Sequence, residues 1–415
     1  MKPGHWYRLS GDNPDLDLDA TYPGTRYLED GDPARSPALN PPGDFKERLR
    51  RVLGRRPSAP WQGRSGFSAI TEAWNGAVYA SNHGVCGSMI IFGGGHNDYF
   101  GSDVHAFDLA SRCWLRISDG YVSGDPRSYG AGAIYPESTY PDGSALPPHT
   151  YDYVQYDPVG NDFILFKGQV ELGQDVKAVS IPHMFNLSSL SWRRGPVHPR
   201  AILDSGGWTT WDPTRRVLWG NSGDAGNGNA FVGFYPDGQN DDGTFGSWGE
   251  MYPSKLPGKA DHNAMQLDSR RDLIILAAHE TDWLYAFTPA VPTLPLTSLW
   301  NSGERPKIFP YGALEFAWNL DCLICYSANY GKRIYGIFPP NVSSWKQPSS
   351  GCWRWVCLAD ANCSLDPIAD AAAATSYAIN LTHTFGRFRV VTFARRDVAI
   401  LVRHVDSPVY AMALN

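Results

Sequence analysis

A unit of short strands repeats along the chain, and this repeat constrains the fold more than any other feature of the sequence. The clearest copy contains an apolar strand, "MIIFGGGH" (89–96), followed by an aromatic strand, "VHAFDL" (104–109). Further copies of the apolar strand lie at 163–169, 217–223, 273–280, 323–330 and 398–404. Recurrence of one small unit indicates a repeat architecture, in which copies of the unit bury their apolar faces against one another.

Each unit has two further strands. A strand that ends in a turn precedes the apolar strand, as in "VQYDPVGND" (154–162), and in most units a strand led by tryptophan comes last, as in "WLRI" (114–117). Four strands per unit, repeated radially, predict an all-β fold with a single β-propeller domain over residues 1–415. We count six units and keep seven blades as the alternative. The last unit lacks its tryptophan strand, so we expect "HWYRL" (5–9) to close the ring there, because an unpaired strand edge is an aggregation hazard.

The first unit, "IIFGGGHNDYFGSDVHAFDLASRCWLRI" (90–117), resembles a Kelch repeat. The signature of that repeat is a strand that ends in two glycines, then an aromatic strand with aspartate, then a tryptophan strand. The resemblance covers most of the chain at the level of the repeats. It implies the propeller fold but no particular function, because one fold can carry many functions.

Charge and hydropathy exclude some classes of partner. The formal net charge is −6, which is unlike the basic surface of a nucleic-acid-binding protein. No apolar run approaches the roughly 18 residues that a membrane span requires. No secretory hydrophobic region follows Met1, so we expect either a cytoplasmic chain or one whose signal has been removed. We expect a monomer that binds neither nucleic acid nor membrane.

Histidines gather at one face of the predicted ring. In antiparallel blades, the start of the first strand and the end of the second strand share a face. The histidines at these positions are His96, His149, His262, His279, His383 and His404. Three insertions, at 10–65, 119–148 and 361–382, rise from the same face. Long loops and polar residues at one mouth predict a site there.

Cysteines collect at the opposite face. Two units carry cysteines at equivalent positions, and these predict the disulfides Cys86–Cys113 and Cys322–Cys352. A third disulfide, Cys357–Cys363, is an open alternative. Disulfides indicate an oxidising compartment, so we predict a secreted protein. The glycosylation sequons at Asn186, Asn341, Asn362 and Asn380 agree with export.

The pattern "GGGHNDY" (93–99) followed by "HTYDYVQYDP" (149–158) resembles secreted propeller polysaccharide lyases such as the ulvan lyases. Those enzymes use histidine and tyrosine beside a neutralising arginine. The resemblance implies β-elimination at a uronic acid of an acidic polysaccharide. This reaction needs a base, an acid for the departing oxygen, and a cation or donor that stabilises charge next to the carboxylate.

The candidate residues for this chemistry come from the His-rich face. The predicted catalytic residues are His96, His149, Tyr151 and His262. The predicted substrate-binding residues, which include candidates for neutralising the carboxylate and for stacking on sugar rings, are Asn97, Tyr99, Arg127, Lys167, Gln169, Arg200, Trp208, Asn263, His279, Tyr330 and His404.

Other functions stay open from the sequence. A metal-dependent lyase would hold a divalent ion on His262, His279 and His404 with Gln169. A glycoside hydrolase needs two carboxylates, for which the candidates are Asp98, Asp152, Asp261, Glu280 and Glu315. A carbohydrate-binding propeller without catalysis would use the same aromatic and amide side chains. A copper-radical oxidase is disfavoured, because no Tyr-His dipeptide occurs.

Overall fold

The innermost hairpins show how the sequence makes the strands turn. Asp157, Asp212 and Asp268 each end a strand, and each carboxylate accepts a hydrogen bond from the backbone N–H two residues on, at 2.9, 3.0 and 3.2 Å. Four residues after each aspartate, the backbone takes a positive φ, as at Arg216 (50°) and Asp272 (53°). This turn chemistry reverses the chain within a few residues and sets the register of each hairpin.

The computed structural model describes residues 1–9, 70–71, 74–94, 102–118, 133–134, 139–140, 142–169, 171–172, 178–179, 181–198, 208–222, 230–253, 264–277, 283–304, 306, 312–341, 351–374, 384, 386–403 and 407–415. Within these residues the fold is all-β, built mainly from four-stranded antiparallel sheets. The helical elements of note are α3 (Pro367–Ala374) and the short η4 (Ala328–Tyr330). None of the described helices is both long and apolar enough to cross a membrane.

Six four-stranded units follow one another along the described chain. Unit one contains β2 (Ala77–Ala80), β3 (Ser88–Ile91), β4 (Val104–Asp108) and β5 (Cys113–Ser118). Unit two contains β7 (Val154–Asp157), β8 (Asp162–Leu165), β12 (His183–Asn186) and β13 (Ser191–Arg194). Unit three contains β14 (Thr209–Asp212), β15 (Val217–Ser222), β16 (Ala230–Gln239) and β17 (Phe245–Pro253).

The second half of the chain continues the pattern. Unit four contains β18 (Ala264–Asp268), β19 (Leu273–Ala277), β20 (Leu284–Phe287) and β21 (Thr297–Gly303). Unit five contains β22 (Ala313–Ala317), β23 (Cys322–Tyr326), β24 (Tyr335–Phe338) and β25 (Cys352–Cys357). Unit six contains β26 (Phe388–Phe393), β27 (Arg396–Leu401), β28 (Tyr410–Ala413) and β1 (Trp6–Arg8).

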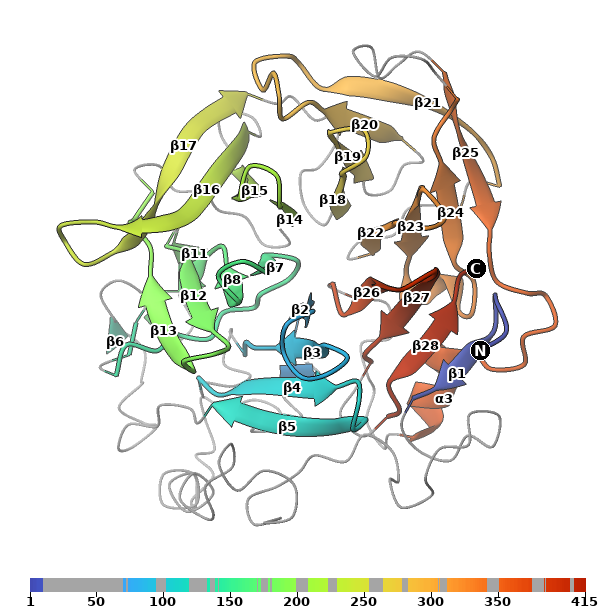
Figure 1. Cartoon of the computed structure of the whole chain (residues 1–415), viewed down its shortest axis with the longest axis horizontal. Helices are drawn as coiled ribbons and strands as arrows, with labels where there is room; N and C mark the ends of the chain where they lie inside the picture. The colour runs from blue at the N-terminus through green and yellow to red at the C-terminus, as the bar shows by residue number, and fades with distance from the viewer. Residues whose placement is uncertain are drawn as a thin grey trace.

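The units surround a central axis (Figure 1). The innermost strands β2, β7, β14, β18, β22 and β26 contact one another in that order, and β26 also contacts β2. At the periphery, β21 and β25 pair in parallel and join units four and five into one eight-stranded sheet. The arrangement is consistent with propeller blades.

The N-terminal strand completes the last unit, which confirms the prediction for residues 5–9. β1 pairs antiparallel with β28, with Trp6 opposite Met412 and Arg8 opposite Tyr410. Both chain ends therefore lie in the same sheet (Figure 1). The pairing covers the strand edge that β28 would otherwise expose.

A hydrophobic cluster fills each space between neighbouring units. Residues alternate between the two sides of a strand, so Ile91 packs toward unit six while Ile90 packs toward unit two. Both sides of the second strand of each unit are therefore buried. This explains why strands such as β19 and β23 are continuous apolar runs in the sequence rather than alternating ones.

The predicted disulfides are not formed, which corrects the sequence interpretation. Cys86, Cys322, Cys352, Cys357 and Cys363 all carry free thiols. The register explains the second pair: Cys322 lies level with Arg354, two strands away, and Cys352 lies two residues further along β25. Two strand spacings amount to roughly 9–10 Å, which exceeds the separation of about 4.4–6.8 Å between Cα atoms that a disulfide allows.

The other two predicted disulfides are also not formed. Cys86 lies just before β3 and Cys113 begins β5, and β4 lies between these two strands. Cys363 is buried against the N-terminal strand, where its Sγ accepts a hydrogen bond from the Trp6 N–H at 3.3 Å. The Cys363 thiol also donates to the Leu365 carbonyl at 3.4 Å. The cysteines therefore no longer support the prediction of export.

Candidate functional site

Part of the predicted site lies outside the described residues. The residues concerned are His96, Asn97, Tyr99, Arg127, Arg200, His262, Asn263, His279 and His404. Gln169 lies in the short strand β9 (Gly168–Gln169), which pairs with β11 (Ala178–Val179). A further short pair joins β6 (Ala133–Ile134) to β10 (Glu171–Leu172). The other described candidates are His149, Tyr151, Lys167, Trp208 and Tyr330.

The structure brings three of these candidates together. His149 and Tyr151 precede β7, and Lys167 follows β8, so all three lie at the same end of unit two. The rings of His149 and Tyr151 are perpendicular, with centroids 5.8 Å apart. The Lys167 ammonium lies 4.9 Å from the centroid of the Tyr151 ring. This group, with Trp74, is called the His149 cluster below.

Trp74 joins the cluster from the segment before β2. Its ring centroid lies 5.6 Å from that of His149 and 5.8 Å from that of Tyr151. The Lys167 ammonium also lies 4.6 Å from the centroid of the Tyr153 ring, so cation–π contacts on two rings hold it. Tyr151, Lys167 and His149 are nearly fully buried, at 2%, 4% and 7% exposed. An imidazole and a phenol, which can take part in proton transfer, thus lie beside an ammonium and an aromatic surface.

Hydrogen bonds fix the backbone that carries the cluster. The Tyr151 N–H donates to the Trp74 carbonyl at 2.8 Å, and the Thr150 N–H donates to the Asn75 side-chain oxygen at 2.9 Å. Gly93, in the triple-glycine segment, lies directly against Asn75 with φ +137°, and a Cβ there would approach Asn75 Oδ1 to 2.2 Å. The glycine therefore permits a close approach that positions the segment before His149.

Tyr151 has an unusual backbone conformation. Its φ is +45°, in the left-handed region that a bulky side chain rarely adopts. The other described non-glycine residues with positive φ lie in hairpin turns, whereas Tyr151 lies outside any hairpin. Such strain costs about 1–3 kcal/mol and persists only where the surrounding structure enforces it.

A buried ionic triad lies next to the cluster, at the central axis. Arg389 on β26 donates to Glu315 Oε1 on β22 at 2.5 Å and to Asp152 Oδ1 at 3.1 Å. Burial raises the pKa of Asp152 to about 7, although Arg389 acts in the opposite direction. Burial also raises the pKa of Glu315. Asp152 and Glu315, both candidates for hydrolysis, are therefore held around one guanidinium.

Sequence reasoning missed two buried arginines at the same face. Arg387 directly precedes β26, and its guanidinium donates to the Thr71 carbonyl at 2.8 Å, close in sequence to Trp74. Arg403 follows the end of β27. Burial, and then repulsion from Arg403, lowers the pKa of Arg387 to about 9. Lys167 was selected because it lies just after the second strand of its unit. Arg403 occupies the same position in unit six, so the same reasoning would have found it.

Two predicted binding residues have other surroundings. Trp208 is fully buried and packs edge-on against Phe231 at 5.8 Å in the core between units three and four. No face of its ring is accessible in the described structure, and its role in substrate binding stays a prediction. Tyr330 lies at the end of η4, where it packs against Tyr335 at 5.2 Å. Burial, reinforced by the Cys325 thiol, raises the pKa of Tyr330.

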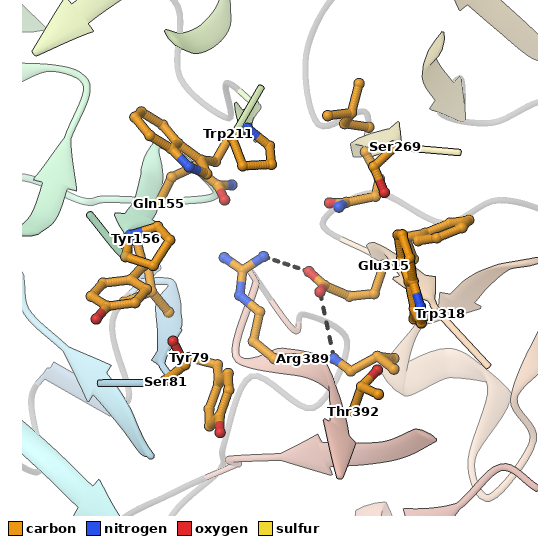
Figure 2. Close-up of a pocket in the computed structure, with 17 residues that line it drawn as sticks. Tyr79, Ser81, Gln155, Tyr156, Trp211, Ser269, Glu315, Trp318, Arg389 and Thr392 are labelled. Atoms are coloured by element: carbon orange, nitrogen blue, oxygen red, sulfur yellow. Dashed lines mark hydrogen bonds and ion pairs between the residues drawn. The ribbon is translucent and has the colours of Figure 1, made fainter. Parts of the chain in front are cut away.

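A cavity of about 460 Å³ opens at the other end of the axis. It is lined by residues of the innermost strands and of the turns that follow them, such as Tyr156 within β7 and Pro158 after it. The His149 cluster precedes β7, so the cavity and the cluster lie at opposite ends of that strand. Figure 2 shows Arg389 and Glu315 pointing toward one another at the centre of the cavity.

Comparison with known proteins finds no protein-family model and no curated protein that matches the chain. Among the described residues, no group of three histidine, cysteine, aspartate or glutamate side chains is placed to hold a metal ion. The three histidines predicted for a divalent metal lie outside those residues. The site must therefore be interpreted from its own geometry.

Proposed function

We infer that the protein is a six-bladed, Kelch-like β-propeller that cleaves a uronic-acid-containing polysaccharide by β-elimination at the His149 cluster. The observation that carries this proposal is the convergence of His149, Tyr151 and Lys167, with Tyr151 held in a strained backbone conformation. Strain of this kind is concentrated at functional sites. The closed ring of innermost strands supports the propeller.

The reaction assigns one role to each side chain. His149 takes the proton from the carbon α to the carboxylate, and the electron pair of that C–H bond forms the new carbon–carbon double bond. The bond between the β carbon and the glycosidic oxygen breaks, and the phenol of Tyr151 protonates that oxygen. Lys167 supplies the positive charge that stabilises both the developing negative charge at the carboxylate and the phenolate left on Tyr151.

The alternatives have less support. A glycoside hydrolase would need two free carboxylates. Of its candidates, Asp152 and Glu315 are both buried against Arg389, and Asp98, Asp261 and Glu280 lie outside the described residues. A carbohydrate-binding protein would use Trp74 but has no need of a strained tyrosine. Action outside the cell is proposed from the polymeric substrate and from the exposed sequon asparagines Asn341 and Asn362. Asn186 does not add to this, because its amide donates to Gly160 and Asp162.

The decisive experiment follows the ultraviolet absorbance of the unsaturated uronate during incubation with a panel of uronic-acid polysaccharides. The expected result is a rise with at least one substrate. Tyr151→Phe should lower kcat/KM by about 10²–10⁴-fold, the usual contribution of general acid–base catalysis. Tyr235→Phe is the matched control, because Tyr235 is exposed on β16 and lies outside the cluster.

Each other outcome has a defined meaning. Absence of unsaturated product from every substrate overturns the lyase for that panel, and release of reducing ends without unsaturation assigns a hydrolase instead. Binding of polysaccharide without any turnover, unchanged in Tyr151→Phe, assigns a carbohydrate-binding protein. A chelator that abolishes turnover assigns the metal-dependent version of the reaction.

A further inference from the structure

The cavity at the far end of the axis has the properties of a second binding site. All six innermost strands contribute to its wall, so it lies on the central axis of the ring. Its volume of about 460 Å³ falls in the range of about 300–1,000 Å³ that is usual for small-molecule sites. It lies at the opposite end of β7 from the His149 cluster, so the lyase reaction does not use it.

Two tryptophans form facing walls of the cavity. Figure 2 shows Trp211, from β14, and Trp318, from the turn after β22, on opposite sides of the opening. Trp318 is 47% exposed, which is unusual for so large an apolar side chain. The Arg270 guanidinium lies 4.7 Å from its ring centroid and donates to its carbonyl at 2.7 Å. The exposed indole is therefore held in place rather than free to move.

Amide groups are available between these walls. The Gln155 side-chain N–H donates to the Thr209 carbonyl at 2.9 Å, which fixes the amide and leaves its oxygen as an acceptor at the cavity. Gln266 also lines the cavity, and its side chain has no hydrogen-bond partner among the described residues. Both hydrogen-bond donors and acceptors are thus presented next to aromatic faces.

The charge of the cavity favours an uncharged ligand. Glu315 and Arg389 are the only carboxylate and guanidinium among the described lining residues, and they pair with each other at 2.5 Å. Burial raises the pKa of Tyr79 to about 12 and also raises that of Tyr156, so both phenols stay neutral at ordinary pH. Neither an anion nor a cation would find an unpaired charge of opposite sign.

We propose that this cavity binds a neutral sugar unit, with its ring between Trp211 and Trp318 and its hydroxyl groups on Gln155 and Gln266. Flat apolar faces next to a rim of hydroxyls are the shape of a pyranose, and aromatic side chains with fixed amides complement both parts. The site would hold a saccharide without cleaving it, because Glu315, the one carboxylate among its described lining residues, is engaged by Arg389. This inference stands apart from the lyase reaction.

Tryptophan fluorescence and titration calorimetry test the proposal with methyl glycosides of glucose, galactose, mannose and xylose as probes. The expected result is saturable binding of at least one glycoside, weakened about tenfold or more in Trp318→Ala and in Gln266→Ala. The matched control is Trp300→Ala, since Trp300 is 76% exposed on β21 and lies outside the cavity. All three variants should keep the polysaccharide turnover of the parent.

Two further probes decide the class of ligand. Glucuronate and tetramethylammonium carry opposite charges, and neither should compete with the bound glycoside. Failure of every glycoside to bind overturns the proposal, as does equal binding by the parent and Trp318→Ala. Preferential binding of either charged probe overturns the neutral class. These results are independent of whether the His149 cluster proves to be catalytic.

Discussion

At the scale of single residues, the neighbouring residues Tyr151 and Asp152 contact different groups. The Tyr151 ring lies against the His149 ring and the Lys167 ammonium, while the Asp152 carboxylate accepts from Arg389 at 3.1 Å. The positive φ of Tyr151 allows two successive side chains to reach different environments. The strained residue therefore belongs to the candidate site and directly precedes a member of the buried triad.

Asp152→Asn should remove a pH dependence of stability. Burial raises the pKa of Asp152 to about 7 from an ordinary value of 3.8, so the folded protein binds this proton more tightly than the unfolded chain. The resulting stabilisation is complete below about pH 4 and is lost as pH rises through about 7, by at most a few kcal/mol. Asparagine keeps the oxygen that accepts from Arg389 but cannot ionise.

Urea unfolding of the parent and of Asp152→Asn at about pH 5 and about pH 8 measures this effect. The variant should gain stability relative to the parent at the higher pH. Asp242→Asn is the control, because hydrogen bonds from Thr244 lower the pKa of the exposed Asp242 and so keep it ionised at both values. Parallel pH profiles for the parent and Asp152→Asn would contradict the prediction.

At the scale of elements, ion pairs connect the hairpins of neighbouring units. Arg215 in unit three donates two hydrogen bonds to Asp272 in unit four, both at 2.6 Å. Arg271 in unit four repeats the contact with Asp321 in unit five, at 2.7 and 2.6 Å. Each arginine also bonds the aspartate that ends its own first strand. A bidentate arginine that bridges two carboxylates constrains the angle between successive units.

Arg271→Ala should lower the free energy of unfolding by about 1–3 kcal/mol, because it removes the partner of the nearly fully buried Asp268. The control is Arg395→Ala, since Arg395 is exposed in the turn between β26 and β27 and should change stability by less than about 0.5 kcal/mol. Chemical denaturation of both variants gives the comparison. Equal free energies of unfolding for Arg271→Ala and Arg395→Ala would contradict the prediction.

At the scale of the whole molecule, the N-terminal strand holds the two ends of the chain together. Trp6 is 3% exposed in the cluster between units five and six, and its indole N–H donates to the Lys332 carbonyl at 2.8 Å. Arg8 forms an ion pair with Asp370 of α3. β1 therefore connects the last sheet to the helix that follows unit five as well as closing the edge of β28.

Removal of residues 1–9 should expose the β28 edge and leave less apolar surface buried in the folded chain. Loss of Trp6 alone corresponds to about 3–5 kcal/mol, the usual cost of deleting a buried tryptophan side chain. The truncated chain should unfold at a lower temperature and self-associate in light scattering, because an open edge strand pairs with other chains. Removal of residues 1–3 only is the control, since it leaves β1 intact. A monomeric truncated chain with unchanged thermal stability would contradict the prediction.

The limits of sequence reasoning can be traced to particular residues. The strand pattern correctly predicted that residues 5–9 pair with the last unit, and the positional rule brought His149, Tyr151 and Lys167 to one end of unit two. The disulfides were wrong because equivalent positions in two repeats do not imply a short distance within one repeat. The sequence could not show that Trp208 is buried in the core, because a tryptophan near the start of a strand is equally compatible with a core and with a rim.

The sequence by itself determined the strands, their turns and their grouping in fours, because apolar continuity and turn chemistry are local properties of the chain. It also placed His149 at the end of unit two that carries Tyr151 and Lys167, since strand direction follows from the order of the strands. Only the tertiary structure decided which charged groups meet: Asp152 precedes unit two, whereas Glu315 and Arg389 belong to units five and six. The cavity on the opposite face was likewise invisible beforehand, because a cavity made by six strands depends on their final distances.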